Sequence, residues 1–113
     1  MMLGRDSMVV NTGGEKVFVE EVEEVLRAHD EIADALVVGR PSERFGQEVV
    51  AVVELVDGSA LAPVDIREVV ASALARFKAP RAVLITDHVE RYANGKANYT
   101  WAKEVAVDAV DAS

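Results

Sequence analysis

The stretch Gly4–Glu24, GRDSMVVNTGGEKVFVEEVEE, decides how the rest of the chain is interpreted. Residues 8–10 and 16–19 are two short runs that consist mostly of the β-branched and aromatic residues that favour strands. Between them lie Gly13 and Gly14, which can take positive φ angles in a tight turn and carry no Cβ to block another surface. We therefore predict a β-hairpin with a glycine tip. A helix should follow directly at residues 20–24, EEVEE, because carboxylates in the first turns of a helix interact favourably with its N-terminus.

Composition restricts the class of protein. At 113 residues and 50% hydrophobic, the chain is long enough for one domain with a modest core. A net charge of −8 disfavours binding to phosphodiester backbones, so we expect no nucleic-acid partner. There is no cysteine, which excludes disulfides and thiolate chemistry and makes the cytoplasm the default compartment. The longest purely apolar run, Val49–Val53, is too short for a transmembrane segment.

A phosphate-binding glycine loop is missing from the sequence. There is no Walker-type motif and no other stretch rich in Gly, Ser and Thr that could surround the phosphates of a nucleotide. If this protein acts on ATP, most of the nucleotide site must therefore lie on another domain.

Three further strands are predicted from apolar runs at residues 33–39, 48–56 and 81–86. The run of valine and alanine in the second of them is typical of a central strand buried on both faces. Proline and glycine at residues 40–46 indicate a loop between the first two. We predict an α+β fold, in which the glycine-tipped hairpin is followed by a small three-stranded sheet packed with helices.

Helices are predicted at three places. The first spans residues 20–29, and the last contains Tyr99, Trp101, Ala102 and Val105. The second begins at Pro63, a favoured first helical residue, and ends at Lys78-Ala79-Pro80. Its apolar face is expected to comprise Val64, Val69, Val70, Ala73, Leu74 and Phe77. The tail, residues 107–113, is small and acidic without a pattern, and we expect it to fray.

Asn94-Gly95-Lys96 is the second informative motif. Glycine flanked by asparagine permits a sharp turn, so Lys96 should project from it just before the last helix. Taken alone, this pattern indicates an ordinary surface lysine.

Together the two motifs resemble a known family. The Gly4-Arg5 pair, GGEKV at residues 13–17 and EEVEE at residues 20–24 are similar to the hairpin motif that opens the C-terminal domain of acyl-adenylate-forming ligases. The nearest version is that of the fatty-acyl-CoA synthetases. Asn94-Gly95-Lys96 lies where that family carries its lysine, so the resemblance extends from Gly4 to about Val105.

The resemblance implies a domain organisation. Residues 1–7 would be the hinge remnant from a missing N-terminal AMP-binding domain, residues 8–106 the C-terminal lid domain, and residues 107–113 the tail. Ungapped spacing puts the hinge at Ser7, with Asp6 as the alternative. Arg5 would lie near the ribose or phosphate of the adenylate, or would be a solvated arginine.

It also implies a two-step reaction. A fatty acid attacks ATP to give acyl-AMP and pyrophosphate, and CoA then displaces AMP to give acyl-CoA. Lys96 would stabilise charge in the first step. Gly13 and Gly14 would line the tunnel for CoA in the second, flanked by Glu15 and by Lys16, which could contact CoA phosphates. Mg²⁺ would be held by the missing domain, so no metal ligand is assigned to this chain.

Two alternatives stay open at this point. The chain could be a stand-alone interaction module that reuses the fold, or the same domain from a different adenylating enzyme, such as a peptide-synthetase adenylation domain. In the preferred interpretation, the isolated chain is inactive by itself.

Overall fold

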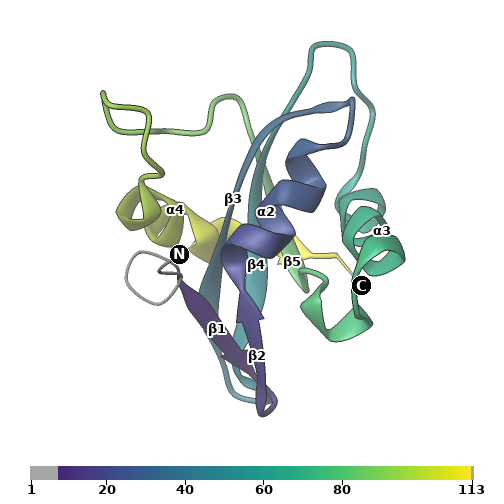
Figure 1. The fold of residues 1–113 in the computed structure, drawn as a ribbon, viewed down its shortest axis with the longest axis vertical. Helices are drawn as coiled ribbons and strands as arrows, with labels where there is room; N and C mark the ends of the chain where they lie inside the picture. The colour runs from purple at the N-terminus through teal and green to yellow at the C-terminus, as the bar shows by residue number, and fades with distance from the viewer. Residues whose placement is uncertain (1–7, 113) are drawn as a thin grey trace.

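Strand β4 (Gly46–Leu55) lies at the centre of the structure, a computed structural model that describes residues 8–112 (Figure 1). It pairs antiparallel with β3 (Ile32–Ser42) and parallel with β5 (Ala82–Thr86). Its first residue also pairs with Thr12 at the end of the hairpin, which makes one six-stranded mixed sheet. The other elements are β1 (Val9–Thr12), β2 (Glu15–Phe18), α2 (Val19–Arg27), α3 (Pro63–Ala73), the 3₁₀ turn η1 (Arg76–Lys78), α4 (Tyr99–Val105), the 3₁₀ turn η2 (Ala106–Asp108) and β6 (Val110–Asp111).

The sheet is buried on both faces because successive side chains of β3 and β4 point to opposite sides. On one face, Ala35 and Val37 pack with α2 and α3 in a first core that also contains Val22, Leu26, Ile66 and Val70. On the other face, Leu36 and Val38 pack with Ala102 of α4 and Ala106 of η2 in a second core. Figure 1 shows the sheet between α3 on one side and α4 on the other.

The predicted fold class is confirmed. The expected three-stranded sheet is present as β3, β4 and β5, and the hairpin and β6 extend that same sheet. The expected loop at residues 40–46 is shorter than predicted, since β3 continues to Ser42 and β4 begins at Gly46. Among residues 8–112, no helix is both long enough and apolar enough to cross a membrane.

The second helix differs from its prediction. It ends at Ala73, because Leu74 takes an extended backbone with φ −129° and ψ 179° and packs against the first core. The following turn η1 leaves Phe77 42% exposed. Val64, which was expected on the apolar face, is 50% exposed, whereas Ile66, which was not, is fully buried. The predicted apolar face is therefore wrong at Val64 and Phe77, and the prediction omits Ile66, the larger of the two buried residues of α3.

The tail was also predicted wrongly. Instead of fraying, it forms η2 and then β6, which pairs antiparallel with β5. The N–H of Ala112 donates to the carbonyl of Arg81 at 2.9 Å, and Ala112 is only 1% exposed. Residues 110–112 therefore cover the outer edge of β5, which would otherwise present unpaired backbone groups.

Ile66→Ala should lower the free energy of unfolding by about 2–5 kcal/mol, because it leaves a cavity between α3 and the first core. Val64→Ala on the same helix is the matched control and should change stability much less, since Val64 is half exposed. Urea unfolding of the two variants checks this. Equal losses would mean that α3 docks through a different face.

Candidate functional site

The hairpin tip is made by Gly13 and Gly14, whose φ angles are +58° and +87°. A type I′ turn requires positive φ at both central residues, which glycine supplies without strain. The N–H of Gly13 donates to the carbonyl of Phe45 at 2.9 Å, so the tip is tied to the connection between β3 and β4. Gly13, Gly14, Glu15 and Lys16 are all exposed. A Cβ at Gly14 would meet no described atom within 4 Å, so the tip is open to an approaching surface.

A hollow of about 200 Å³ lies beside the tip. It is lined by Thr12, Gly13, Glu15, Phe45, Arg67, Arg76, Phe77, Ala79 and Arg81. The guanidinium of Arg81 lies 4.5 Å from the centre of the Phe45 ring, and that of Arg44 lies 5.1 Å from it. Although the chain has a net charge of −8, three arginines, Arg67, Arg76 and Arg81, line this one hollow. Guanidinium groups are well suited to bind an anionic group such as a phosphate.

Lys96 lies in a tight turn of residues 92–96 whose backbone is held by its own hydrogen bonds. The N–H of Tyr92 donates to the carbonyl of Lys96 at 3.0 Å, and the N–H of Gly95 donates to the carbonyl of Tyr92 at 2.8 Å. The N–H of Lys96 donates to the side-chain oxygen of Asn94 at 3.0 Å. Gly95 takes φ +87°, as the sharp turn requires. These contacts give the turn a defined shape while the lysine itself stays exposed.

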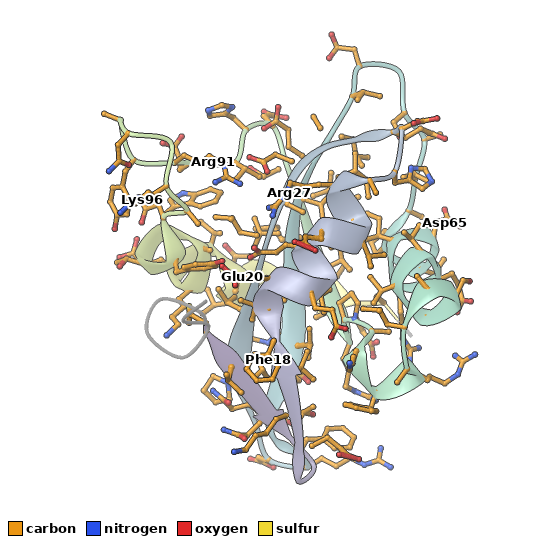
Figure 2. The ribbon with its side chains drawn as sticks, viewed as in Figure 1. Phe18, Glu20, Arg27, Asp65, Arg91 and Lys96 are labelled. Atoms are coloured by element: carbon orange, nitrogen blue, oxygen red, sulfur yellow. The ribbon has the colours of Figure 1, made fainter. Side chains whose placement is uncertain are left out.

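Lys96 is one of the residues that line a second hollow of about 330 Å³, together with Glu20 and Tyr99. Figure 2 shows Lys96 at the upper left of the molecule, whereas the hairpin tip lies at the bottom. The structure therefore presents the two predicted motifs on separate parts of the surface and does not bring them together.

Glu23 is the principal buried charged group near the lysine turn. It lies on α2 and is 2% exposed. Its Oε2 accepts the N–H of Val37 on β3 at 2.8 Å, and the hydroxyl of Tyr99 on α4 donates to the same oxygen at 2.9 Å. These bonds connect three elements and satisfy a carboxylate that burial would otherwise make costly.

Asp34 and Arg91 form a second pair. Arg91 donates from Nε to Oδ2 of Asp34 at 2.8 Å and from Nη2 to Oδ1 at 2.9 Å, which is a two-pronged arrangement. Its third nitrogen, Nη1, donates to the carbonyl of Gly95 at 3.1 Å. Arg27 is close to both acids, with its Nη1 at 3.7 Å from Glu23 and 3.8 Å from Asp34.

These contacts shift the pKa values of Glu23, Asp34, Arg91 and Tyr99, and that of Arg91 is raised by its hydrogen bond to Asp34. Burial raises the pKa of Glu23, although the hydrogen bonds from Val37 and Tyr99 oppose the shift. Burial would also raise the pKa of Asp34. The hydrogen bonds that Asp34 accepts from Arg91 and from the backbone N–H of Ala35 outweigh burial, so the pKa of Asp34 is lowered. Burial and the charge of Glu23 raise the pKa of Tyr99, which keeps its hydroxyl protonated as a donor. At neutral pH, Asp34 is therefore an anion held by Arg91.

Three predicted site residues cannot be placed: Arg5, Asp6 and Ser7 lie outside the described residues. No group of three or more His, Asp or Glu side chains that could hold a metal ion is found within residues 8–112.

Sequence reasoning missed Glu23, Tyr99, Asp34 and Arg91. For Glu23 a signal existed, because it falls between Val22 and Leu26 on the apolar side of a 3.6-residue period. For Asp34 and Arg91 no local signal could serve, since the two residues are 57 positions apart.

The chain is similar to known acyl-CoA ligases over most of its length. It is 54% identical over 110 residues to the medium-chain acyl-CoA ligase Mig of Mycobacterium avium, which covers 95% of this chain and 20% of that protein. It is 48% identical over 103 residues to the 3-oxocholest-4-en-26-oate–CoA ligase of Rhodococcus rhodochrous, which covers 91% of this chain and 19% of that protein. The chain thus spans about one fifth of the length of these relatives.

A solved structure and a family model also match the chain. The crystal structure of ATP-bound MatB from Rhodopseudomonas palustris matches with a TM-score of 0.82 and 30% identity, over 91% of this chain and 20% of that one. The model of one family, the AMP-binding enzyme C-terminal domain, matches residues 21–96, a range that ends at Lys96. The chain belongs to the AMP-binding enzyme C-terminal domain family.

Proposed function

We propose that this chain is the mobile C-terminal domain of an ATP-dependent fatty-acid–CoA ligase, which converts acid, ATP and CoA to acyl-CoA, AMP and pyrophosphate. The observation that carries the proposal is the exposure of Lys96 and of the Gly13-Gly14 tip on separate parts of one domain. The relatives, which are acyl-CoA ligases, favour this reaction over an interaction module or a peptide-synthetase domain. The absence of cysteine is consistent with the cytoplasm as its compartment.

In the first step, Lys96 faces the N-terminal AMP-binding domain. Attack of the fatty-acid carboxylate on the α-phosphorus of ATP builds negative charge on the phosphate oxygens. A compact ammonium on a defined turn stabilises that charge without acting as a nucleophile. Arg5 would contact the adenylate in this arrangement. Mg²⁺ and most of the nucleotide would be held by the other domain, since this sequence contains no phosphate-binding glycine loop.

In the second step, the domain rotates about the hinge at Ser7 or Asp6 and presents the hairpin tip. Gly13 and Gly14 then line the path of the CoA thiol, because a narrow path leaves no room for side chains. Glu15 and Lys16 flank it. The arginines of the neighbouring hollow would add positive charge for the phosphates of CoA, which supports this end of the domain as the CoA-facing one.

Lys96→Ala should slow acyl-AMP formation by about 10²–10³-fold, as the loss of one preorganised donor does elsewhere. The test uses a chimera in which this chain replaces the matching segment of the Mycobacterium avium ligase. Thioester formation from supplied acyl-AMP should be unchanged. Lys103→Ala, an exposed lysine on α4, is the matched control. Equal losses in both half-reactions would refute the assigned role.

Gly13→Asn should impair thioester formation and leave acyl-AMP formation unchanged, the reverse of the pattern expected for Lys96→Ala. Asn-Gly is well suited to a type I′ turn, so the hairpin should keep its shape while gaining a side chain at the tip. In the same chimera we expect thioester formation to slow about tenfold, which corresponds to a barrier higher by about 1.4 kcal/mol, with acyl-AMP formation unchanged. Gly58→Asn is the control, since Gly58 also has positive φ, +86°, and lies in open space. A Gly13→Asn variant that forms thioester at the unmodified rate would exclude the tip from the CoA path.

The isolated chain should form neither acyl-AMP nor acyl-CoA from ATP, Mg²⁺, CoA and palmitate, because it has no nucleotide cradle of its own. Turnover above the no-enzyme background, measured by release of pyrophosphate and abolished by Lys96→Ala, would show that the chain is a complete enzyme.

A further inference from the structure

The lysine turn is attached to the rest of the domain at both ends. Arg91 precedes the turn and forms an isolated β-bridge with Ala97, which follows Lys96. Tyr99 comes two residues later as the first residue of α4. The side chains of Arg91 and Tyr99 extend to Asp34 and Glu23, which lie on β3 and α2.

Arg91 is the more direct of the two attachments. Two of its nitrogens bond the two oxygens of Asp34, and the third bonds the carbonyl of Gly95, the residue immediately before Lys96. The side chains of Arg91 and Asp34 are only 29% and 19% exposed, so water and salt weaken this pair less than a surface pair. One planar group therefore spans the distance between a core strand and the backbone beside Lys96.

We propose that Arg91 is a positioning residue for Lys96, held in place by the Asp34 carboxylate. This inference rests on the proposed function of Lys96. Arg91 does not touch the substrate; it fixes the carbonyl of Gly95 and, through it, the direction in which the next side chain leaves the turn. A lysine at this position could keep the charge but could not make three bonds in fixed directions, because its ammonium is a single point donor group.

Arg40 provides a matched control inside the same domain. It also pairs with a carboxylate, that of Glu48, and its Nη1 also donates to backbone carbonyls, those of Ala106 and Ala109. Its side chain is 23% exposed, close to that of Arg91. Within residues 8–112, the side chain of Arg40 makes no hydrogen bond to the lysine turn. A replacement there should cost similar stability without moving Lys96.

The experiment compares Arg91→Lys, Arg40→Lys and Asp34→Asn. In the isolated ¹⁵N-labelled chain, heteronuclear NOE values report the mobility of the Gly95 and Lys96 amides, and urea unfolding reports stability. In the chimera, the two half-reactions are measured separately. We expect Arg91→Lys to loosen both amides and to slow acyl-AMP formation by about 10–100-fold, since small misplacements of a reacting group are costly. Thioester formation should be unchanged.

Asp34→Asn should have the same pattern with a smaller effect, because it keeps the shape of the acid but removes its charge. Arg40→Lys should lower the urea midpoint without selective loss of either half-reaction. The inference is overturned if Arg91→Lys leaves acyl-AMP formation intact, or if both half-reactions fall together as stability falls. Failure of the proposed function would look different: Lys96→Ala itself would then have no effect on acyl-AMP formation, while the NOE values would still report whether Arg91 holds the turn.

Discussion

The outer edge of β3 imposes the main constraint on this domain. Its backbone groups need partners, and no described strand lies on that side. Side chains of α2 supply partners for two of these groups: Glu23 accepts the N–H of Val37, and Arg27 donates to the carbonyl of Ala35 at 2.8 Å. This arrangement puts a buried carboxylate and a guanidinium at the edge of the sheet. Tyr99 then donates to that carboxylate, and the lysine turn lies beside it.

The same sheet separates the two proposed working surfaces. The hairpin tip is braced by the carbonyl of Phe45 and belongs to the end of the sheet where β3 turns into β4. The turn of Lys96 is braced by Asp34, near the start of β3. Because packed interiors resist deformation, the two surfaces keep a fixed separation. A domain that rotates as one body can therefore present one surface and withdraw the other without any internal rearrangement.

The central strands and the hairpin could be predicted from the sequence, because each depends on a pattern of neighbouring residues. The apolar runs predicted the central strands, and the glycine pair predicted the hairpin. The apolar face of the second helix is predicted wrongly because valine and alanine occur on more than one side of it, so periodicity does not single out Ile66. Pairing of the tail with β5 and of Asp34 with Arg91 depends on distant residues, which no local pattern encodes. Glu23 was interpreted with its acidic neighbours, although its place in the apolar stripe set it apart.

The central place of β4 has a consequence for the order of folding. Its pairing with β3 needs only a three-residue connection, which closes at small entropic cost. Its parallel pairing with β5 must wait for the crossover through α3. The anchors of the lysine turn span still longer separations, 57 residues for Arg91 and 76 for Tyr99. We therefore expect the turn to be among the last parts to take its final shape, well after the scaffold on which it rests.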